Sequence, residues 1–105
     1  MILIKEPHTK LNMTRSEIDG FIDTLDVGVI VPDNLDEGFI GVAIEEDPPR
    51  AVYSIERCIR KLAEDMTHEE AEEFYEYNIL GAYMGDMTPI YVSEHDSIYE
   101  FTLPD

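Results

Sequence analysis

The stretch THEEAEEFYEYNILGAYMGDMTPIYV, residues 67–92, constrains the fold more than any other part of the chain. It opens with a capping box, because Thr67 can accept a hydrogen bond from the backbone N–H of Glu70 while the Glu70 carboxylate reaches back to Thr67. The pattern predicts a helix that runs to Gly85, where a left-handed residue can end it. Pro89 then favours an extended exit, and the apolar residues 90–92 predict a strand.

Helical spacing divides this predicted helix into two faces. The face expected to pack on the rest of the domain is mainly apolar and consists of Ala71, Phe74, Tyr75, Asn78, Gly81 and Ala82. The opposite face is a row of acids, Glu69, Glu72, Glu73 and Glu76. Asn78 is expected to hydrogen-bond a backbone segment, because an unpaired buried amide costs about 1–3 kcal/mol. The alternative is a small site that Asn78 lines with Tyr77 and Thr88.

The other patterns predict two more helices and several short strands. A second capping box at Thr14 and Glu17 begins a helix over residues 15–25, and Ser54 can cap a helix that ends near residue 65. Short β-branched or apolar runs predict strands at 27–31, 39–44, 51–53 and 98–103. Together they predict an α+β fold, in which residues 1–105 form a small single domain with three helices packed on a short, mostly antiparallel sheet.

The net charge of −17 restricts the classes of partner. With 24 acids against seven bases, direct binding to nucleic acid or to an anionic membrane is unfavourable. No apolar run is long enough to span a bilayer and the first residues do not form a signal peptide pattern, so we expect a cytoplasmic protein. The acidity either serves solubility alone or recognises a basic partner.

The sequence contains no pattern that is typical of an enzyme or a metal site. His8, His68 and His95 are scattered without zinc spacing, and the one cysteine, Cys58, lies on an inward helical face. The glutamate row faces away from the predicted core, and no histidine follows at the spacing of a helix-bundle metal site. We therefore expect no catalytic residue, no cofactor and no bound metal.

Several blocks between Gly38 and Val92 carry a family resemblance. They are GFIGVA at 38–43, AVY at 51–53, CI at 58–59, MTHEEA at 66–71, EYNILGAYMG at 76–85 and TPIYV at 88–92. With these blocks the segment resembles a family of small, mostly uncharacterised proteins of tailed bacteriophages and prophages. The resemblance implies a phage or prophage origin and carries no activity with it. Residues 1–37, a variable acidic N-terminal part, and residues 93–105 lie outside it.

These observations predict a non-enzymatic, phage-encoded accessory protein that binds and inhibits or modulates a host protein with a basic surface. Host nucleic-acid-processing or defence complexes fit this description. Carboxylates one helical turn apart are separated by about 5.4 Å along the axis, comparable with about 3.4 Å between phosphates of a DNA strand, so the acids can resemble a nucleic acid. The predicted partner-binding residues are the acids of two helices and an apolar patch: Glu69, Glu72, Glu73, Glu76, Asp19, Asp23, Asp26, Leu80, Tyr83 and Met84.

Two alternatives stay open. In the first, the chain is a self-associating structural or regulatory module, whose subunit interface is the patch of Leu80, Tyr83 and Met84 and whose acids serve only solubility. In the second, it is an enzyme or a small-ligand-binding protein with a pocket near Asn78.

Overall fold

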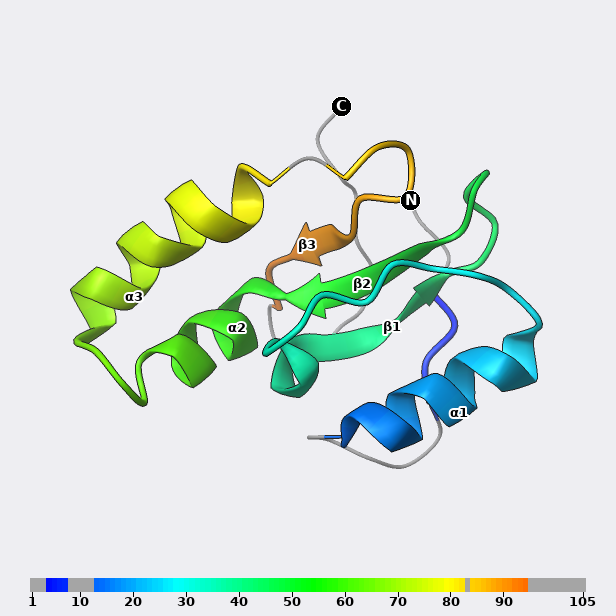
Figure 1. Ribbon diagram of the computed structural model, residues 1–105, viewed down its shortest axis with the longest axis horizontal. Coiled ribbons are helices and arrows are strands. Elements are labelled where there is room, and N and C mark those ends of the chain that lie inside the picture. Colours follow the sequence, from blue (N-terminus) through cyan, green and yellow to red (C-terminus); the bar gives the residue numbers. More distant parts are fainter. Residues whose placement is uncertain (1–3, 8–12, 83, 95–105) are drawn as a thin grey trace.

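The computed structural model describes residues 4–7, 13–82 and 84–94 of the chain (Figure 1). Three strands, β1 (Phe39–Ala43), β2 (Arg50–Ser54) and β3 (Ile90–Val92), form one sheet in the order β1-β2-β3. β1 and β2 are an antiparallel hairpin, whereas β3 pairs parallel to β2 because the intervening helices return the chain to the start of the sheet. The sheet is therefore mostly antiparallel, and the predicted α+β class is confirmed.

Three α-helices begin at the caps that the sequence predicts. Thr14 and Thr67 form complete capping boxes for α1 (Arg15–Leu25) and α3 (His68–Phe74), and Ser54 caps α2 (Ile55–Leu62). A short 3-10 turn, η1 (Asp36–Gly38), precedes β1, and α3 continues directly into a π-helix, η2 (Tyr75–Leu80). Within the described residues, no helix is both long and apolar enough to cross a bilayer.

Three predicted boundaries are wrong. α2 ends at Leu62 instead of residue 65, and the helix that α3 begins ends at Leu80, before Gly85. Gly85 does have a positive φ of 79°, but it lies in the following turn. Residues 27–31 form a connection that pairs with no strand among the described residues, and the carbonyl oxygen of Val31 accepts a hydrogen bond from the side chain of Arg15 instead. The predicted strand at 98–103 lies outside the described residues.

A row of aromatic rings connects the helices through the sheet. It runs from Phe21 of α1 to Phe39 and Tyr53 in the hairpin, and on through Tyr91 of β3 to Tyr75 at the start of η2. Successive ring centroids lie 6.1, 5.7, 5.9 and 5.8 Å apart, and three of the four pairs are edge-to-face. This geometry is favourable for aromatic quadrupoles, so the row fixes the helices relative to one another.

A β-bulge in β1 sets which side chains face the helices. The register shifts between Phe39 and Gly41, so that Phe39 and Val42 both face the helices although they are three residues apart. Ile40 and Ala43 instead join a smaller buried cluster with residues of β2 and β3. Gly41 is required here, because a Cβ at this position would collide with the backbone carbonyl oxygen of Lys5, which pairs with Val42.

The π-helix overturns the predicted facing of the last helix. Ala71, Tyr75 and Ile79, spaced every four residues, are buried, whereas Asn78 is exposed. Ala71 and Tyr75 are buried as predicted, whereas the next buried residue is Ile79 of η2, where the i→i+5 bonding widens the turn, and not Asn78. Phe74, the last residue of α3, and Asn78 are both exposed at the side of the helix rather than in the core.

Candidate functional site

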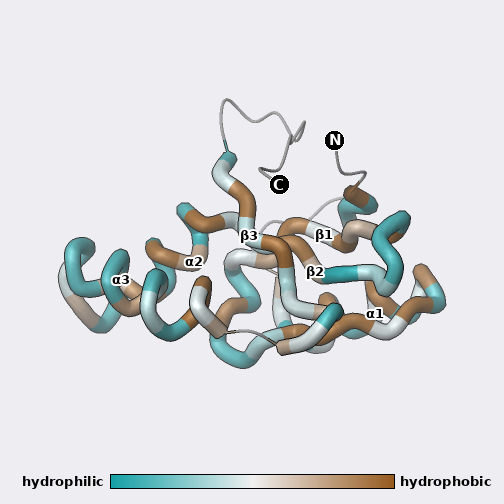
Figure 2. Tube along the Cα trace, turned by 90° about the horizontal axis from the view of Figure 1, so that it is seen from above, coloured by the Kyte–Doolittle hydropathy of each residue, from teal (hydrophilic) through white to brown (hydrophobic). Residues whose placement is uncertain are grey.

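The acid row of α3, which extends to Glu76 at the start of η2, is fully on the surface. Glu69, Glu72, Glu73 and Glu76 are all exposed, and hydrophilic residues dominate this helix (Figure 2). Glu72 lies 2.9 Å from His68 Nε2. Among the residues that the structure describes, no lysine or arginine forms an ion pair with the other three carboxylates. The row therefore presents uncompensated negative charge to solvent.

Glu70, in the first turn of α3, both carries negative charge and forms part of the capping box that begins the helix. Its carboxylate accepts a hydrogen bond of 3.0 Å from the backbone N–H of Thr67. That bond lowers the pKa of Glu70 below its ordinary value, because it stabilises the charged form. The first turn of α3 is thus anionic and held in place by its own cap.

The predicted acids of α1 do not join this row. Asp19, Asp23 and Asp26 are exposed as expected, and Asp19 lies 3.4 Å from Arg15 on its own helix. α1 lies toward the opposite end of the molecule from α3 in both views (Figure 1, Figure 2). The two acidic helices are thus separate surfaces, and a partner that covers one need not reach the other.

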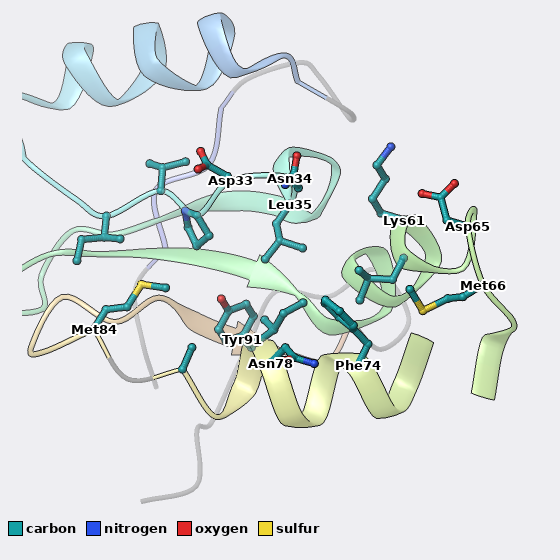
Figure 3. Close-up of a pocket in the computed structure, with 16 residues that line it drawn as sticks. Asp33, Asn34, Leu35, Lys61, Asp65, Met66, Phe74, Asn78, Met84 and Tyr91 are labelled. Carbon is teal, nitrogen blue, oxygen red and sulfur yellow. The ribbon is translucent and has the colours of Figure 1, made fainter. Parts of the chain in front are cut away.

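A largely apolar groove of about 730 Å³ runs beside α3 (Figure 3). One wall is the connection at residues 30–35, the other is the side of α3 and η2, and the end of α2 closes it. Its main apolar lining is Leu35, Leu62, Met66, Phe74, Met84 and Tyr91. The charged ends of Asp33, Lys61 and Asp65 point away from Phe74 and Tyr91 in Figure 3, so charge is confined to the rim.

Arg15 holds the first wall of the groove in place. Its Nη2 donates a hydrogen bond of 3.0 Å to the carbonyl oxygen of Val31, and its Nη1 lies 3.5 Å from Asp33 and 3.7 Å from Asp36. Burial raises the pKa of Asp36, and the guanidinium of Arg15 opposes that rise. Arg15 was not among the residues predicted to be functional. It is the one base between Lys10 and Arg50, a stretch that contains Asp33 and Asp36, and this isolation in the sequence is a signal that it could pair with them.

Large apolar side chains are left partly exposed along the same helix. The exposed fractions are 41% for Phe74, 56% for Leu80 and 80% for Tyr77, and Met84 is exposed at 38%. Phe74 and Met84 line the groove, whereas Leu80 lies outside it and Tyr83 is outside the described residues. Leu80 and Met84 of the predicted apolar patch are thus both exposed, and Phe74, which the sequence had placed in the core, lines the groove with Met84.

Of the three residues that the sequence suggested for a small site, Asn78 and Tyr77 line one shallow hollow, whereas Thr88 does not line it. Asn78 also lines the neighbouring groove. Thr88 belongs to a turn, where its hydroxyl accepts from the backbone N–H of Met84 at 2.8 Å and donates to the carbonyl of Gly85 at 2.6 Å. The hydroxyl of Thr88 is thus used within the turn.

Burial determines the protonation of the one cysteine. Burial raises the pKa of the Cys58 thiol to about 12, so the nucleophilic thiolate is disfavoured. In the described part of the chain, no group of three or more His, Cys, Asp or Glu side chains has the arrangement of a metal site. Comparison with family models, curated proteins and solved structures gave no match to this chain. The acid row and the groove are therefore the features from which a function can be argued.

Proposed function

We propose that this chain is a non-catalytic, phage-encoded acidic protein that binds a basic surface of a host protein, such as a nucleic-acid-processing or defence complex. The observation that carries the proposal is the outer face of α3, where Glu69, Glu73 and Glu76 are exposed without a basic partner among the described residues. Such a row attracts cations of a partner across roughly 8 Å at physiological salt and raises the association rate.

Exposed apolar surface beside the acid row supports binding to a protein. Phe74 and Tyr77 belong to the same helical segment as the glutamates. Aromatic side chains are enriched at protein interfaces, where they supply most of the binding free energy, whereas exposed charges mainly supply rate and specificity. Charge would bring the basic partner to α3, and apolar contact would hold it there. The phage origin in this proposal depends on the residue pattern of segment 38–92.

The test is affinity capture from host lysate at low and high salt with three forms of the protein. The wild type is compared with Glu69→Gln/Glu73→Gln/Glu76→Gln on α3 and with Asp19→Asn/Asp23→Asn/Asp26→Asn on α1, which removes the same charge elsewhere. We expect the wild type and the α1 variant to retain a basic host protein at low salt and the α3 variant to lose it. Capture of the same proteins by all three forms, independent of salt, would overturn the proposal.

The groove favours a second candidate function, the binding of a small apolar ligand. Its volume of about 730 Å³ lies within the range of about 300–1,000 Å³ typical of ligand pockets, and Asn78 supplies an amide at its edge. Titration with the apolar dye ANS tests this candidate. Saturable binding that Phe74→Ala abolishes, in the absence of any protein partner, would favour it over the first.

A further inference from the structure

The groove and the acid row of α3 are continuous. A shallower hollow on the far side of Phe74 shares Met66, Phe74 and Asn78 with the groove and adds Glu70 and Glu73 to its lining. An extended occupant that enters the groove can thus cross Phe74 and reach the carboxylates of α3. Apolar contact and negative charge are available to one ligand at the same time.

The lining favours a polypeptide segment over a compact small molecule. Small-ligand pockets position a few polar groups toward the ligand, whereas here the charged ends of Lys61 and Asp65 point away from the apolar interior (Figure 3). Met66 and Met84 lie on opposite sides of the groove, and methionine side chains adapt their shape to different apolar partners. Phe74 stands between groove and hollow as the largest of the partly exposed side chains that line both.

Charge decides what kind of segment fits. Lys61 is the one base among the described residues that line the groove, and it lies 3.1 Å from Glu64 and 3.8 Å from Glu37. Asp33 and Asp65 line the groove, and Glu73 of α3 lines the adjoining hollow. A second copy of this chain carries a net charge of −17 itself and would meet repulsion here.

We infer that the groove takes the apolar side chains of a basic amphipathic segment of the partner protein, whose lysines or arginines pair with Asp65 at the groove and with Glu73 at the adjoining hollow. This inference deepens the proposed function and rests on it. It makes Phe74 the central contact, with charge on both sides of it. Arg15 is a positioning residue, because it holds the wall at Val31 and Asp33 without lining the groove.

The test uses a synthetic amphipathic peptide of leucine, lysine and one tryptophan, with the leucines at helical spacing. The chain has no tryptophan, so the fluorescence anisotropy of the peptide tryptophan reports binding directly. Two control peptides replace every lysine by glutamate or scramble the leucine positions. We expect saturable binding of the first peptide only, weakening as salt is raised.

Matched variants locate the binding. Phe74→Ala should lower the affinity about tenfold, as expected for an aromatic residue at the centre of an interface, whereas Leu80→Ala, on the same helix but outside the groove, should leave it unchanged. Asp65→Asn/Glu73→Gln should lower the affinity at low salt and lose this effect at high salt. Circular dichroism of each variant verifies that it is folded. Arg15→Ala should also weaken binding, and Arg15→Lys should restore part of it.

The outcomes separate the inference from the proposed function. If the lysine peptide binds and only the α3 charge variants weaken it, with Phe74→Ala equal to Leu80→Ala, the acid surface binds partners and the groove does not. If no basic peptide binds at low salt, both are wrong. Equal binding of the glutamate peptide would overturn the basic partner, and ANS binding without peptide binding would assign the groove to a small ligand. Light scattering that shows dimers, dissociated by Phe74→Ala, would assign it to a second copy.

Discussion

The centre of the sheet and the groove side of α3 differ in how far their apolar side chains are buried. Val42, Ala51, Val52, Tyr53 and Cys58 are fully buried in the hairpin and under α2. On α3 and η2, by contrast, Phe74, Tyr77 and Leu80 remain substantially exposed within the same short helical segment. Because these hairpin and α2 side chains are completely buried, the exposure of apolar side chains on α3 and η2 is a property of that helical segment. Exposed apolar side chains beside a groove mark a surface for contact.

The two regions also differ in backbone geometry. The hairpin is regular apart from one bulge, whereas the helix beside the groove widens into a six-residue π-helix. π-helical turns frequently occur at functional positions, because their longer period points side chains away from where an α-helix would place them. Here Phe74 is the last residue before the change of period, and its side chain is exposed and lines the groove.

The largest expected effect is on stability, and it compares the truncation of one side chain in each region. Tyr53→Ala should lower the free energy of unfolding by about 3–5 kcal/mol, as for large aromatic deletions in cores, whereas Leu80→Ala should change it by less than about 0.5 kcal/mol. Urea unfolding followed by circular dichroism measures both. As a control, Tyr53→Phe should be neutral or stabilising, because the buried Tyr53 hydroxyl has no hydrogen-bond partner among the described residues. Similar losses for Tyr53→Ala and Leu80→Ala would remove the contrast between the regions.

Close packing at the centre of the fold gives the second prediction. A Cβ on Gly38 would lie 2.5 Å from Cys58 Sγ, so Gly38→Ala should cost about 1–3 kcal/mol of unfolding free energy. Cys58→Ala removes the obstructing sulfur, and the double variant should be more stable than the sum of the single effects by about 1 kcal/mol. Simple additivity of the two substitutions would mean that the contact is relieved by movement elsewhere.

Alkaline pH should weaken the packed region first. Burial raises the pKa of Cys58 from its ordinary 9.0 to about 12 and that of Tyr91 from 10.0 to about 12, and it also raises the pKa of Tyr53 and Tyr75. The folded state therefore keeps protons that the unfolded chain loses, so the contribution of these groups to the free energy of unfolding is constant below about pH 9 and falls as pH rises toward about 12.

Thermal unfolding at a series of alkaline pH values measures this decline. Cys58→Ala should move its onset upward, from near the ordinary pKa of the thiol, 9.0, to near that of the tyrosines, 10.0. An unchanged onset in Cys58→Ala would mean that the thiol does not contribute.

The smallest expected effect belongs to the acidic surface. Because the net charge of −17 repels itself, added salt should raise the free energy of unfolding by less than about 1 kcal/mol. Glu69→Gln/Glu73→Gln/Glu76→Gln should reduce this salt dependence and leave the stability at high salt unchanged. A large loss of stability in this variant would show that the row supports the fold and is not a free surface.

Local patterns predicted most of the fold. The caps at Thr14, Ser54 and Thr67 fix where each helix begins, and the hairpin follows from apolar runs on either side of an acidic, proline-containing loop. These signals act between residues close in the chain, so sequence alone contains them. The exposure of the α3 glutamates was predicted for the same reason.

The features that sequence could not predict depend on distant contacts. The groove forms where residues 30–35 meet α3 and η2. The predicted strand at 27–31 is wrong, and the carbonyl oxygen of Val31 accepts a hydrogen bond from Arg15 of the preceding helix, a contact that no local pattern predicts. Arg57 likewise pairs with Glu94 at 2.9 Å, far from it in the chain. The π-helix was not predicted, and Phe74 and Asn78, which were assigned to the buried face of the helix, are exposed.

The parallel position of β3 has a consequence for the order of folding. Val42 and Ala51 of the hairpin are close in the chain, whereas Val52 can meet Ile90 only after α2, α3 and η2 have been laid across the sheet. Contacts that close long loops form late, because the entropy of the loop must be lost before they contribute. Tyr91 of β3 forms part of the groove, so the groove should be completed among the last steps of folding. During synthesis, a nascent chain would acquire its hairpin well before it could hold a partner.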